Sequence, residues 1–188
     1  MSLSPIEAIL HRRTVRNYLP DKIPKEQLEK IMEAAKNAPT AGNYQGYDYI
    51  VISNQEKLSN LEKAFIDSLE DDNMKAFINK RREKHGVKNV LTCDAPHLVL
   101  IVRNERADEI WIKYDAGIAS MAIMIAAQAF GIESMCIGAL SQPNTHKKCE
   151  EALGIKDGSL LLAVALGKPT PNYTLHEKEI KTKVSYVD

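Results

Sequence analysis

The sequence has no excess of charge of either sign and is poor in cysteine. Its 188 residues include 25 Lys and Arg and 25 Asp and Glu. A formal charge of zero gives no electrostatic support to a nucleic-acid partner or a membrane surface. The three cysteines, Cys93, Cys136 and Cys149, are widely spaced and form no Cys-x-x-Cys pair or Cys/His cluster. This pattern argues against a metal site and favours a reduced, cytoplasmic protein.

The chain also lacks the marks of secretion and of a membrane span. Its first residues contain no basic region followed by an apolar core, so we expect no secretory signal. The uncharged run at 116–132 includes Gly117, Ser120 and Gln128, and it falls short of the roughly 20 apolar residues that a bilayer requires. We therefore predict a buried helix, whose small residues let other helices approach and favour an extensive subunit interface.

Two catalytic patterns are missing as well. There is no Gly-x-Gly-x-x-Gly loop, which argues against a nicotinamide site of the Rossmann type. The five histidines are dispersed, and none lies in a nucleophile motif. The sequence thus offers no acid–base constellation of its own.

Hydrophobic periodicity predicts one domain, 1–188, in which helices and strands alternate. The predicted helices span 4–11, 25–36, 55–71, 115–130 and 144–153, and the predicted strands span 47–53, 98–102, 133–137 and 160–166. The charged segment 71–88 is either a solvated helix or a mobile excursion near the site. From about residue 169 an extended tail either frays or lies on a partner. The alternation alone is equally compatible with a parallel α/β sheet.

Three arginines and a hydroxyl gather where the first predicted helix ends. Arg12, Arg13 and Arg16 flank Thr14, and each guanidinium offers a planar fork of donors that suits phosphate oxygens. Taken alone, such a run is typical of a solvated basic helix end, which the helix dipole favours.

A second polar segment, 38–45, follows the predicted helix 25–36. Pro39 disfavours helical geometry at the residue before it, so the chain should enter a loop that carries Asn43 and Gln45. On their own these amides would be turn formers. Together with the arginines they suggest two walls of one site for an anion and a ring.

Both segments resemble the amino-terminal signature of the flavin-dependent nitroreductase family. The similarity continues through 131–138, which reads Gly-Ile-Glu-Ser-Met-Cys-Ile-Gly, and through 164–169, which reads Val-Ala-Leu-Gly-Lys-Pro. The resemblance implies an α+β fold, a three-layer α-β-α sandwich with a largely antiparallel central sheet. It also implies FMN as the cofactor.

The resemblance implies which residues contact the flavin. Arg12 and Arg16 would take the phosphate and the ring edge, Thr14 would hydrogen-bond the phosphate, and Gly138 would direct its amide at the reactive ring nitrogen. The full set implied is Arg12, Arg13, Thr14, Arg16, Asn43, Gln45, Cys136, Ile137, Gly138, Ala139, Lys181 and Lys183. Gly46 stands where the family usually has Pro, and Tyr47 where it often has Trp or Phe, so we expect a more flexible loop and an altered pocket.

The function implied is that of a homodimeric, cytoplasmic FMN oxidoreductase. NADH or NADPH would pass a hydride to the flavin and leave, and a small electron-poor acceptor such as a nitroaromatic or a quinone would take its place, which gives ping-pong kinetics. A specialised relative that performs dehalogenation, flavin fragmentation or heterocycle dehydrogenation is an alternative. So is a flavin-binding redox protein with little turnover. A small anion-binding module would instead be colourless.

Overall fold

The computed structural model describes residues 3–142, 145–156 and 158–187. Its helices are α1 (Pro5–His11), α2 (Lys25–Lys36), α3 (Gln55–Asp67), α4 (Asp72–His85), α5 (Ile112–Gln128) and α6 (His146–Leu153). Its strands are β1 (Tyr47–Ile52), β2 (His97–Arg103), β3 (Glu133–Ile137) and β4 (Leu160–Gly167), and two short 3-10 helices are η1 (Ala41–Asn43) and η2 (Ala139–Ser141).

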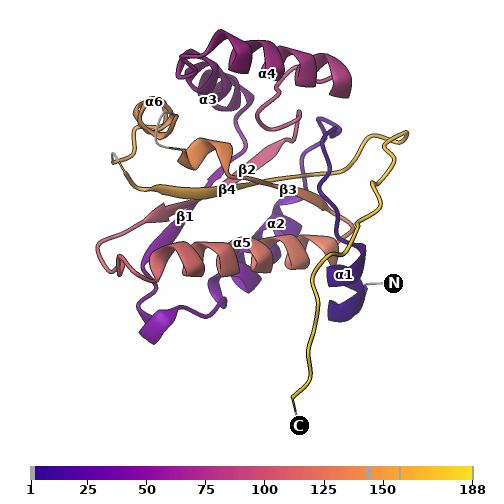
Figure 1. Cartoon of the computed structure of the whole chain (residues 1–188), viewed down its shortest axis with the longest axis vertical. Coiled ribbons are helices and arrows are strands. Elements are labelled where there is room, and N and C mark those ends of the chain that lie inside the picture. The colour runs from indigo at the N-terminus through magenta and orange to yellow at the C-terminus, as the bar shows by residue number, and fades with distance from the viewer. Residues whose placement is uncertain (1–2, 143–144, 157, 188) are drawn as a thin grey trace.

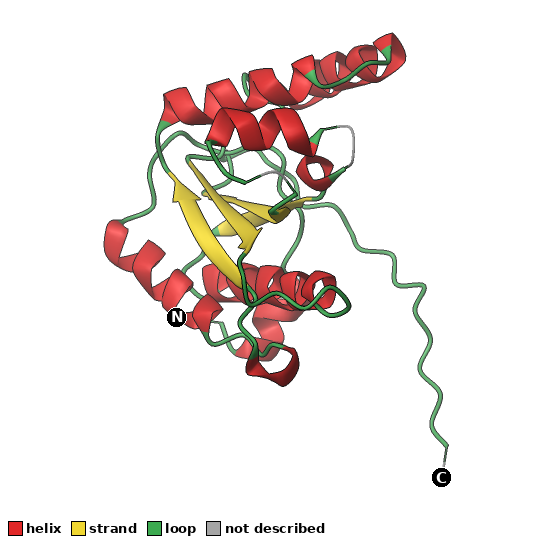
Figure 2. Cartoon of the chain, turned by 90° about the vertical axis from the view of Figure 1, so that its left-hand side faces the viewer, coloured by secondary structure: helices red, strands yellow, loops and turns green. Residues whose placement is uncertain are grey.

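The four strands form one sheet in the order β1-β2-β4-β3, and each neighbouring pair is antiparallel. Helices α3, α4 and α6 cover one face of the sheet, and α2 and α5 cover the other (Figures 1 and 2). The chain is therefore an α+β three-layer sandwich with an antiparallel sheet, which confirms the fold that the family resemblance implies. The parallel sheet that the alternation left open is excluded.

The sheet has a hydrophobic core on each face, and β2 contributes to both. Leu98 and Leu100 point into the layer beneath α3 and α4, while Val99 and Ile101 point into the layer with α2 and α5. All four side chains are fully buried. This explains the continuous apolar run in the sequence, because a central strand that is covered on both faces needs no polar alternation.

The first helix, α1, is followed by residues 12–16, which we call the arginine segment and which lie along the edge of the sheet. A reciprocal capping box starts α1: the Ser4 amide donates to the Glu7 carboxylate at 2.7 Å, and the Glu7 amide donates to the Ser4 hydroxyl at 3.3 Å. After α1 the chain runs beside β3, where Thr14 forms a parallel bridge with Ser134 and the Val15 amide donates to the Ser134 carbonyl at 3.3 Å. The arginine segment is thus fixed to the strand that leads to Gly138.

Several boundaries differ from the predicted ones. Helix α3 ends at Asp67 rather than at residue 71, because Asp71 caps a new helix by accepting from the Asn73 amide at 2.8 Å. The charged segment is therefore helical as α4. Helix α5 begins at Ile112, three residues earlier than predicted. The start of the predicted helix 144–153 falls partly outside the described residues, and α6 begins at His146.

Helix α5, which we predicted to be buried in the core or in a subunit interface, is covered on one side only within the single chain. Its face toward the sheet is buried, whereas Tyr114, Gly117 and Ile118 are exposed on the other side. The tail beyond β4 carries no helix or strand among the described residues; it contacts the body as far as His176, and its end leaves the body of the molecule (Figure 2). None of the described helices is long and apolar enough to cross a bilayer.

The buried His97 at the start of β2 makes the stability of the fold dependent on pH. Its Nε2 accepts from the Ile23 amide at 2.9 Å, so Nδ1 carries the proton and donates to the Ser53 hydroxyl at 2.6 Å. Burial, and then the charge of Lys22, lower the pKa of His97 below its ordinary value. The native state thus binds this proton less readily than the unfolded chain does.

We expect the melting temperature to fall by a few degrees from about pH 7.5 to about pH 5.5, as the pH drops below the ordinary histidine pKa of about 6.5. Thermal unfolding of wild type and His97→Gln at both pH values measures the effect. The variant should lose part of the pH dependence. An identical pH dependence in both proteins would show that other groups cause it.

Candidate functional site

Arg13 is a structural link between the arginine segment and the tail. Its guanidinium donates to the carbonyls of Leu10 at 2.7 Å, Arg12 at 2.9 Å and His176 at 3.2 Å. The Tyr173 hydroxyl adds a bond to the carbonyl of Thr14 at 3.2 Å. These contacts satisfy Arg13 within the chain and hold residues 173–176 against the arginine segment.

Arg12 and Arg16 differ from Arg13 in this respect. Both side chains are half-buried, and neither guanidinium has a hydrogen bond or an ion pair with any residue that the structure describes. Each therefore presents a full set of donors to an anion from outside the chain.

The turn after β3 lies close to Arg12. Desolvation by surrounding atoms raises the pKa of the Cys136 thiol, and the Ser120 hydroxyl and the Arg12 charge oppose this only in part. Cys136 is therefore not activated as a nucleophile, although part of its side chain reaches the surface. The structure thus brings Arg12 together with the turn of residues 136–139.

Gly138 is a glycine that the fold itself does not require. Its backbone adopts φ −82° and ψ −14°, an ordinary right-handed conformation, and a Cβ built on it would meet no atom within 4 Å. Its carbonyl accepts from the Ser141 amide at 3.2 Å and hydroxyl at 3.0 Å, which starts η2. The missing side chain leaves the exposed backbone of the turn open to close approach.

The loop with Asn43 and Gln45 has an unusual backbone. Gly42, Asn43 and Gln45 have φ values of 53°, 55° and 49°, a left-handed region that non-glycine residues rarely adopt. Surrounding bonds impose it: the Ala41 amide donates to the Asp115 carboxylate at 3.1 and 3.3 Å, and the Gln45 amide donates to the Thr40 hydroxyl at 3.1 Å. Such backbone conformations concentrate at functional sites.

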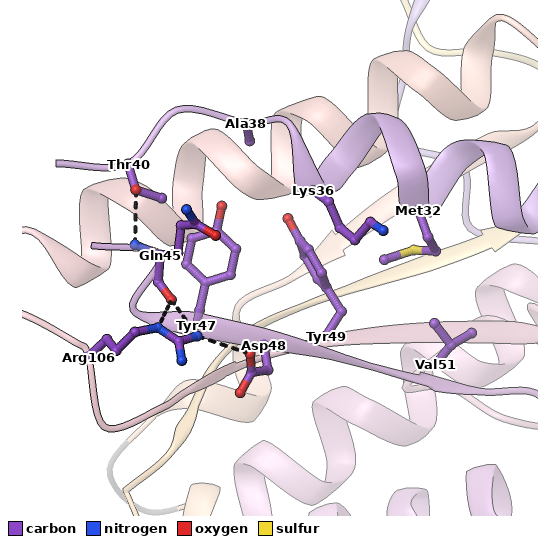
Figure 3. Close-up of a pocket in the computed structure, with 10 residues that line it drawn as sticks. All are labelled: Met32, Lys36, Ala38, Thr40, Gln45, Tyr47, Asp48, Tyr49, Val51 and Arg106. Atoms are coloured by element: carbon purple, nitrogen blue, oxygen red, sulfur yellow. Dashed lines mark hydrogen bonds and ion pairs between the residues drawn. The ribbon is translucent and has the colours of Figure 1, made fainter. Parts of the chain in front are cut away.

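Gln45 is the centre of the bonds that hold this loop. Its side-chain amide donates to the Asn43 side chain at 3.1 Å. Its carbonyl accepts from the Arg106 guanidinium at 3.1 and 3.3 Å and from the Asn104 side chain at 3.1 Å. In Figure 3 Arg106 also reaches Asp48, at 3.6 Å. The loop is thus tied to the segment after β2.

The loop is also tightly packed at Gly46, contrary to the flexibility that we expected from a glycine in place of proline. Gly46 is buried, its carbonyl accepts from the Asn104 amide at 3.0 Å, and a Cβ built on it would lie 2.6 Å from the Cα of Ala107. Only glycine permits this close approach of two backbones.

We expect Gly46→Ala to lower the free energy of unfolding by about 1–3 kcal/mol, because the added methyl group forces one backbone to move. Chemical denaturation measures this. Gly86→Ala and Gly117→Ala are both unsuitable as controls, because Gly86 has φ 62° and Gly117 lies inside α5, where alanine alone stabilises the helix by about 1 kcal/mol. If Gly46→Ala were as stable as wild type, the packing described for this loop would be wrong.

The arginine segment and the Asn43 loop do not share a pocket within one chain. Gln45 lines a cavity of about 430 Å³ between α2 and β1 together with Lys36, Tyr49 and Arg106 (Figure 3). Arg16 lines a different cavity, of about 410 Å³, at the end of α4. The Asn43 loop contacts the first turn of α5 through Asp115, whereas α1 packs beside the other end of α5 (Figure 1).

The remaining predicted site residues lie on the tail. Lys181 and Lys183 are exposed in the segment that leaves the body, and Lys181 pairs with Glu179 at 3.2 Å. Within the described residues, neither lysine has a hydrogen bond or an ion pair with the arginine segment. In the described residues no cluster of three or more His, Cys, Asp or Glu side chains could hold a metal ion.

Sequence reasoning missed the contribution of α4 to the surroundings of Arg16. The Asn17 side chain donates to the carbonyl of His85 at 2.8 Å, and this bond docks the end of α4 beside the arginine segment. The charged composition of 71–88 was visible, but no pattern in the sequence indicates which of its side chains face Arg16.

Comparisons with known proteins identify the family of this chain. Residues 9–168 match the model of the nitroreductase family, and the chain belongs to that family. One relative is a protein of Archaeoglobus fulgidus that is provisionally named NADH dehydrogenase/NAD(P)H nitroreductase. The two sequences are 29% identical over 175 residues, which cover 93% of this chain and 90% of the relative.

Solved structures show the same fold over the whole chain. A nitroreductase with bound FMN from Bacteroides fragilis superposes with a TM-score of 0.79 at 26% identity. Another from Desulfitobacterium hafniense, also with bound FMN, superposes with a TM-score of 0.80 at 24% identity. Each comparison covers 100% of both chains. The family that the sequence motifs suggested is thereby confirmed.

Proposed function

We propose that this chain is an FMN-dependent oxidoreductase that takes electrons from NAD(P)H and reduces small electron-poor acceptors such as quinones and nitroaromatics. The observation that carries the proposal is the pair of guanidiniums, Arg12 and Arg16, without a partner in the described chain, on a fold whose relatives were crystallised with FMN. For a quinone, NAD(P)H and one proton yield NAD(P)⁺ and the hydroquinone.

The residues present fit the cofactor. FMN combines a dianionic phosphate with a ring whose edge carries hydrogen-bonding groups, and it therefore needs cations at one end and donors at the other. Arg12, Arg16 and the Thr14 hydroxyl would hold the phosphate and the ring edge, and the open backbone at Gly138 would face the ring. When bound, FMN supplies the hydride chemistry that no acid–base group of the chain provides. Arg13 positions the segment rather than the cofactor.

The glycine at 138 gives a direct test of where the ring lies. We expect Gly138→Ala to weaken FMN binding by roughly tenfold, about 1.4 kcal/mol, because a methyl group would intrude on the surface that the ring approaches. The free energy of unfolding should change by less than about 0.5 kcal/mol, since the methyl group meets no atom of the chain. Flavin titration and chemical denaturation measure the two effects. Unchanged FMN affinity would place the ring elsewhere.

The site requires two copies of the chain, and we propose a homodimer. The Asn43 loop and Arg12 lie toward opposite ends of α5, so only the loop of a second copy could face the arginine segment of the first. The outer face of α5 offers exposed Tyr114 and Ile118 as an interface, and the tail offers exposed Val184 and Tyr186. Exposed apolar side chains that lie together on a surface are typical of protein–protein interaction sites.

Steady-state kinetics test the catalytic cycle. NAD(P)⁺ leaves before the acceptor binds, so initial rates with NADPH and menadione should give parallel lines in double-reciprocal plots. Intersecting lines would show an obligatory ternary complex and contradict the cycle. A protein that binds flavin but oxidises no NADPH or NADH with menadione or nitrofurazone would be a flavin-binding redox protein instead. The three free cysteines support a reducing, cytoplasmic location.

A further inference from the structure

Helix α4 carries cations that the chain leaves without counter-ions. Two of its basic residues are paired, since Lys75 lies 3.6 Å from Asp72 and Arg82 lies 3.1 Å from Glu62. Three other basic residues of α4, Lys80, Arg81 and Lys84, have no ion pair with any described residue. Like charges one turn apart on a helix destabilise it by a few tenths of a kcal/mol, and a bound anion would relieve this repulsion.

These three residues and Arg16 line one cavity. The cavity, of about 410 Å³, is lined by Phe77 and by the basic residues Arg16, Lys80, Arg81, Lys84, His85 and His176, and no carboxylate of the described residues lines it. Burial lowers the pKa of His85, and so do the charges of Arg81, Arg16, Lys84 and His176, which shows how close these groups lie. In a chain with a formal charge of zero, this concentration of positive charge marks a binding site for an anion.

The cationic cavity continues into an apolar one. A neighbouring, mostly apolar cavity of about 690 Å³ shares Phe77 and Arg81 with it. Its other lining residues include the apolar Phe65, Leu69, Met74 and Ala139 and the acidic Glu70 and Asp71, so an acidic group is favoured only at the cationic end. Phe77 is 53% exposed, and the Arg81 guanidinium lies 5.9 Å from the centre of its ring. An aromatic ligand could therefore stack on Phe77 while its acidic group reaches the cations. We call the two cavities together the α4 trough.

The α4 trough borders the proposed flavin site on both halves. Arg16 lines the cationic half, and Ala139, in the turn after β3, lines the apolar half. Arg16 and Ala139 also belong to the residues that we assign to the flavin, so a molecule in the trough would lie against the bound flavin, whereas Arg12 and Gly138 line neither half of the trough. This is where a second substrate has to bind.

We propose that the α4 trough binds the electron acceptor and selects an aromatic acceptor that carries a carboxylate or a phosphate. This rests on the proposed function. The cations hold the acidic group, Phe77 packs against the ring, and the reducible group is directed toward the flavin. If the cations of α4 instead completed the phosphate site of FMN, their removal would release FMN.

A matched pair of acceptors tests the selection. We expect kcat/KM for para-nitrobenzoate to exceed that for para-nitrobenzamide by roughly tenfold at low salt, the effect of one charge-assisted contact. In a ping-pong cycle this parameter reports only the acceptor half-reaction, so attraction of the donor phosphates does not enter it. The preference should shrink as salt is raised. Equal values for the two acceptors would overturn the proposal.

Substitutions on α4 locate the preference. The triple variant Lys80→Gln, Arg81→Gln, Lys84→Gln should bring the two values to near equality and keep its FMN. Lys75→Gln, on the same helix but outside the trough, should keep the wild-type ratio. A triple variant that loses FMN would show that these cations belong to the flavin phosphate site and would overturn the proposal. A triple variant that keeps the wild-type ratio of kcat/KM for the two acceptors would also overturn the proposal.

Binding of ligands that cannot be reduced gives a second readout. Isothermal titration of the flavin-loaded protein should show tighter binding of para-hydroxybenzoate than of para-hydroxybenzamide, and the triple variant should abolish the difference. Equal binding by wild type would count against the trough. The two failures remain separate: a protein without flavin, or without turnover of neutral menadione, refutes the proposed function, whereas flavin and menadione turnover without a charge preference refute only the trough.

Discussion

Replacing both Arg12 and Arg16 with alanine is expected to weaken FMN binding by about two orders of magnitude. A hydrogen bond to a charged group contributes about 1.5–3 kcal/mol, and about 1.4 kcal/mol corresponds to a factor of ten in the dissociation constant. Two lost contacts at the lower end of that range give the expected effect. The dissociation constant is measured by titrating the apoprotein with FMN and following the quenching of flavin fluorescence.

The stability of the double variant should be close to that of wild type, because neither guanidinium has a hydrogen bond or ion pair in the described chain. Arg103→Ala is the matched control. The Arg103 guanidinium pairs with Glu109, with one of its bonds at 3.0 Å, on a surface away from the arginine segment. The Arg103→Ala variant should bind FMN with the affinity of wild type. A double variant that binds FMN as wild type does would remove the arginine segment from the site.

The substitution Ile118→Asp on α5 is expected to convert the protein into a monomer and to abolish FMN binding with it. Ile118 is 43% exposed in the single chain and lies one turn from Tyr114 on the outer face of the helix. In the proposed dimer this face is buried, and an unpaired carboxylate there would cost several kcal/mol. Light scattering coupled to size exclusion gives the mass, and absorbance gives the flavin content.

The isolated chain should tolerate the substitution, since residue 118 faces solvent in it. Circular dichroism and thermal unfolding verify that the variant is folded. Val51→Asp is the control, because Val51 is 38% exposed on β1, in the cavity of Figure 3 and away from the outer face of α5. This control should keep the mass and the flavin of wild type. If Ile118→Asp remained a dimer with FMN, the α5 interface would be refuted.

Local signals in the sequence were sufficient for most elements but not for the arrangement of the strands. The bounds of α2 agree with the prediction because its apolar spacing is regular and Pro39 follows closely. The direction of the strands depends on long-range pairing such as Tyr47 with Arg103, and no local pattern specifies it. The antiparallel sheet could be expected only from the family resemblance.

The candidate site, like the fold, could be predicted from the sequence only in part. The arginines, the Asn43 loop and Gly138 could be named only because their motifs resemble those of the nitroreductase family, since each segment alone is equally typical of a basic helix end or a turn. The α4 trough could not, since it depends on the docking of α4 through Asn17 and His85. The separation of Gln45 from Arg16 was also hidden, because only the folded chain reveals that they line different cavities.

The absorption spectrum of the purified protein, followed by heat release and chromatography of any chromophore, shows directly whether the chain binds FMN. We expect a flavin spectrum and the release of FMN in stoichiometric amount. A protein that is colourless as purified should regain the spectrum when FMN is added. A colourless protein that also fails to bind added FMN would contradict the account and leave the arginine segment as a site for another anion.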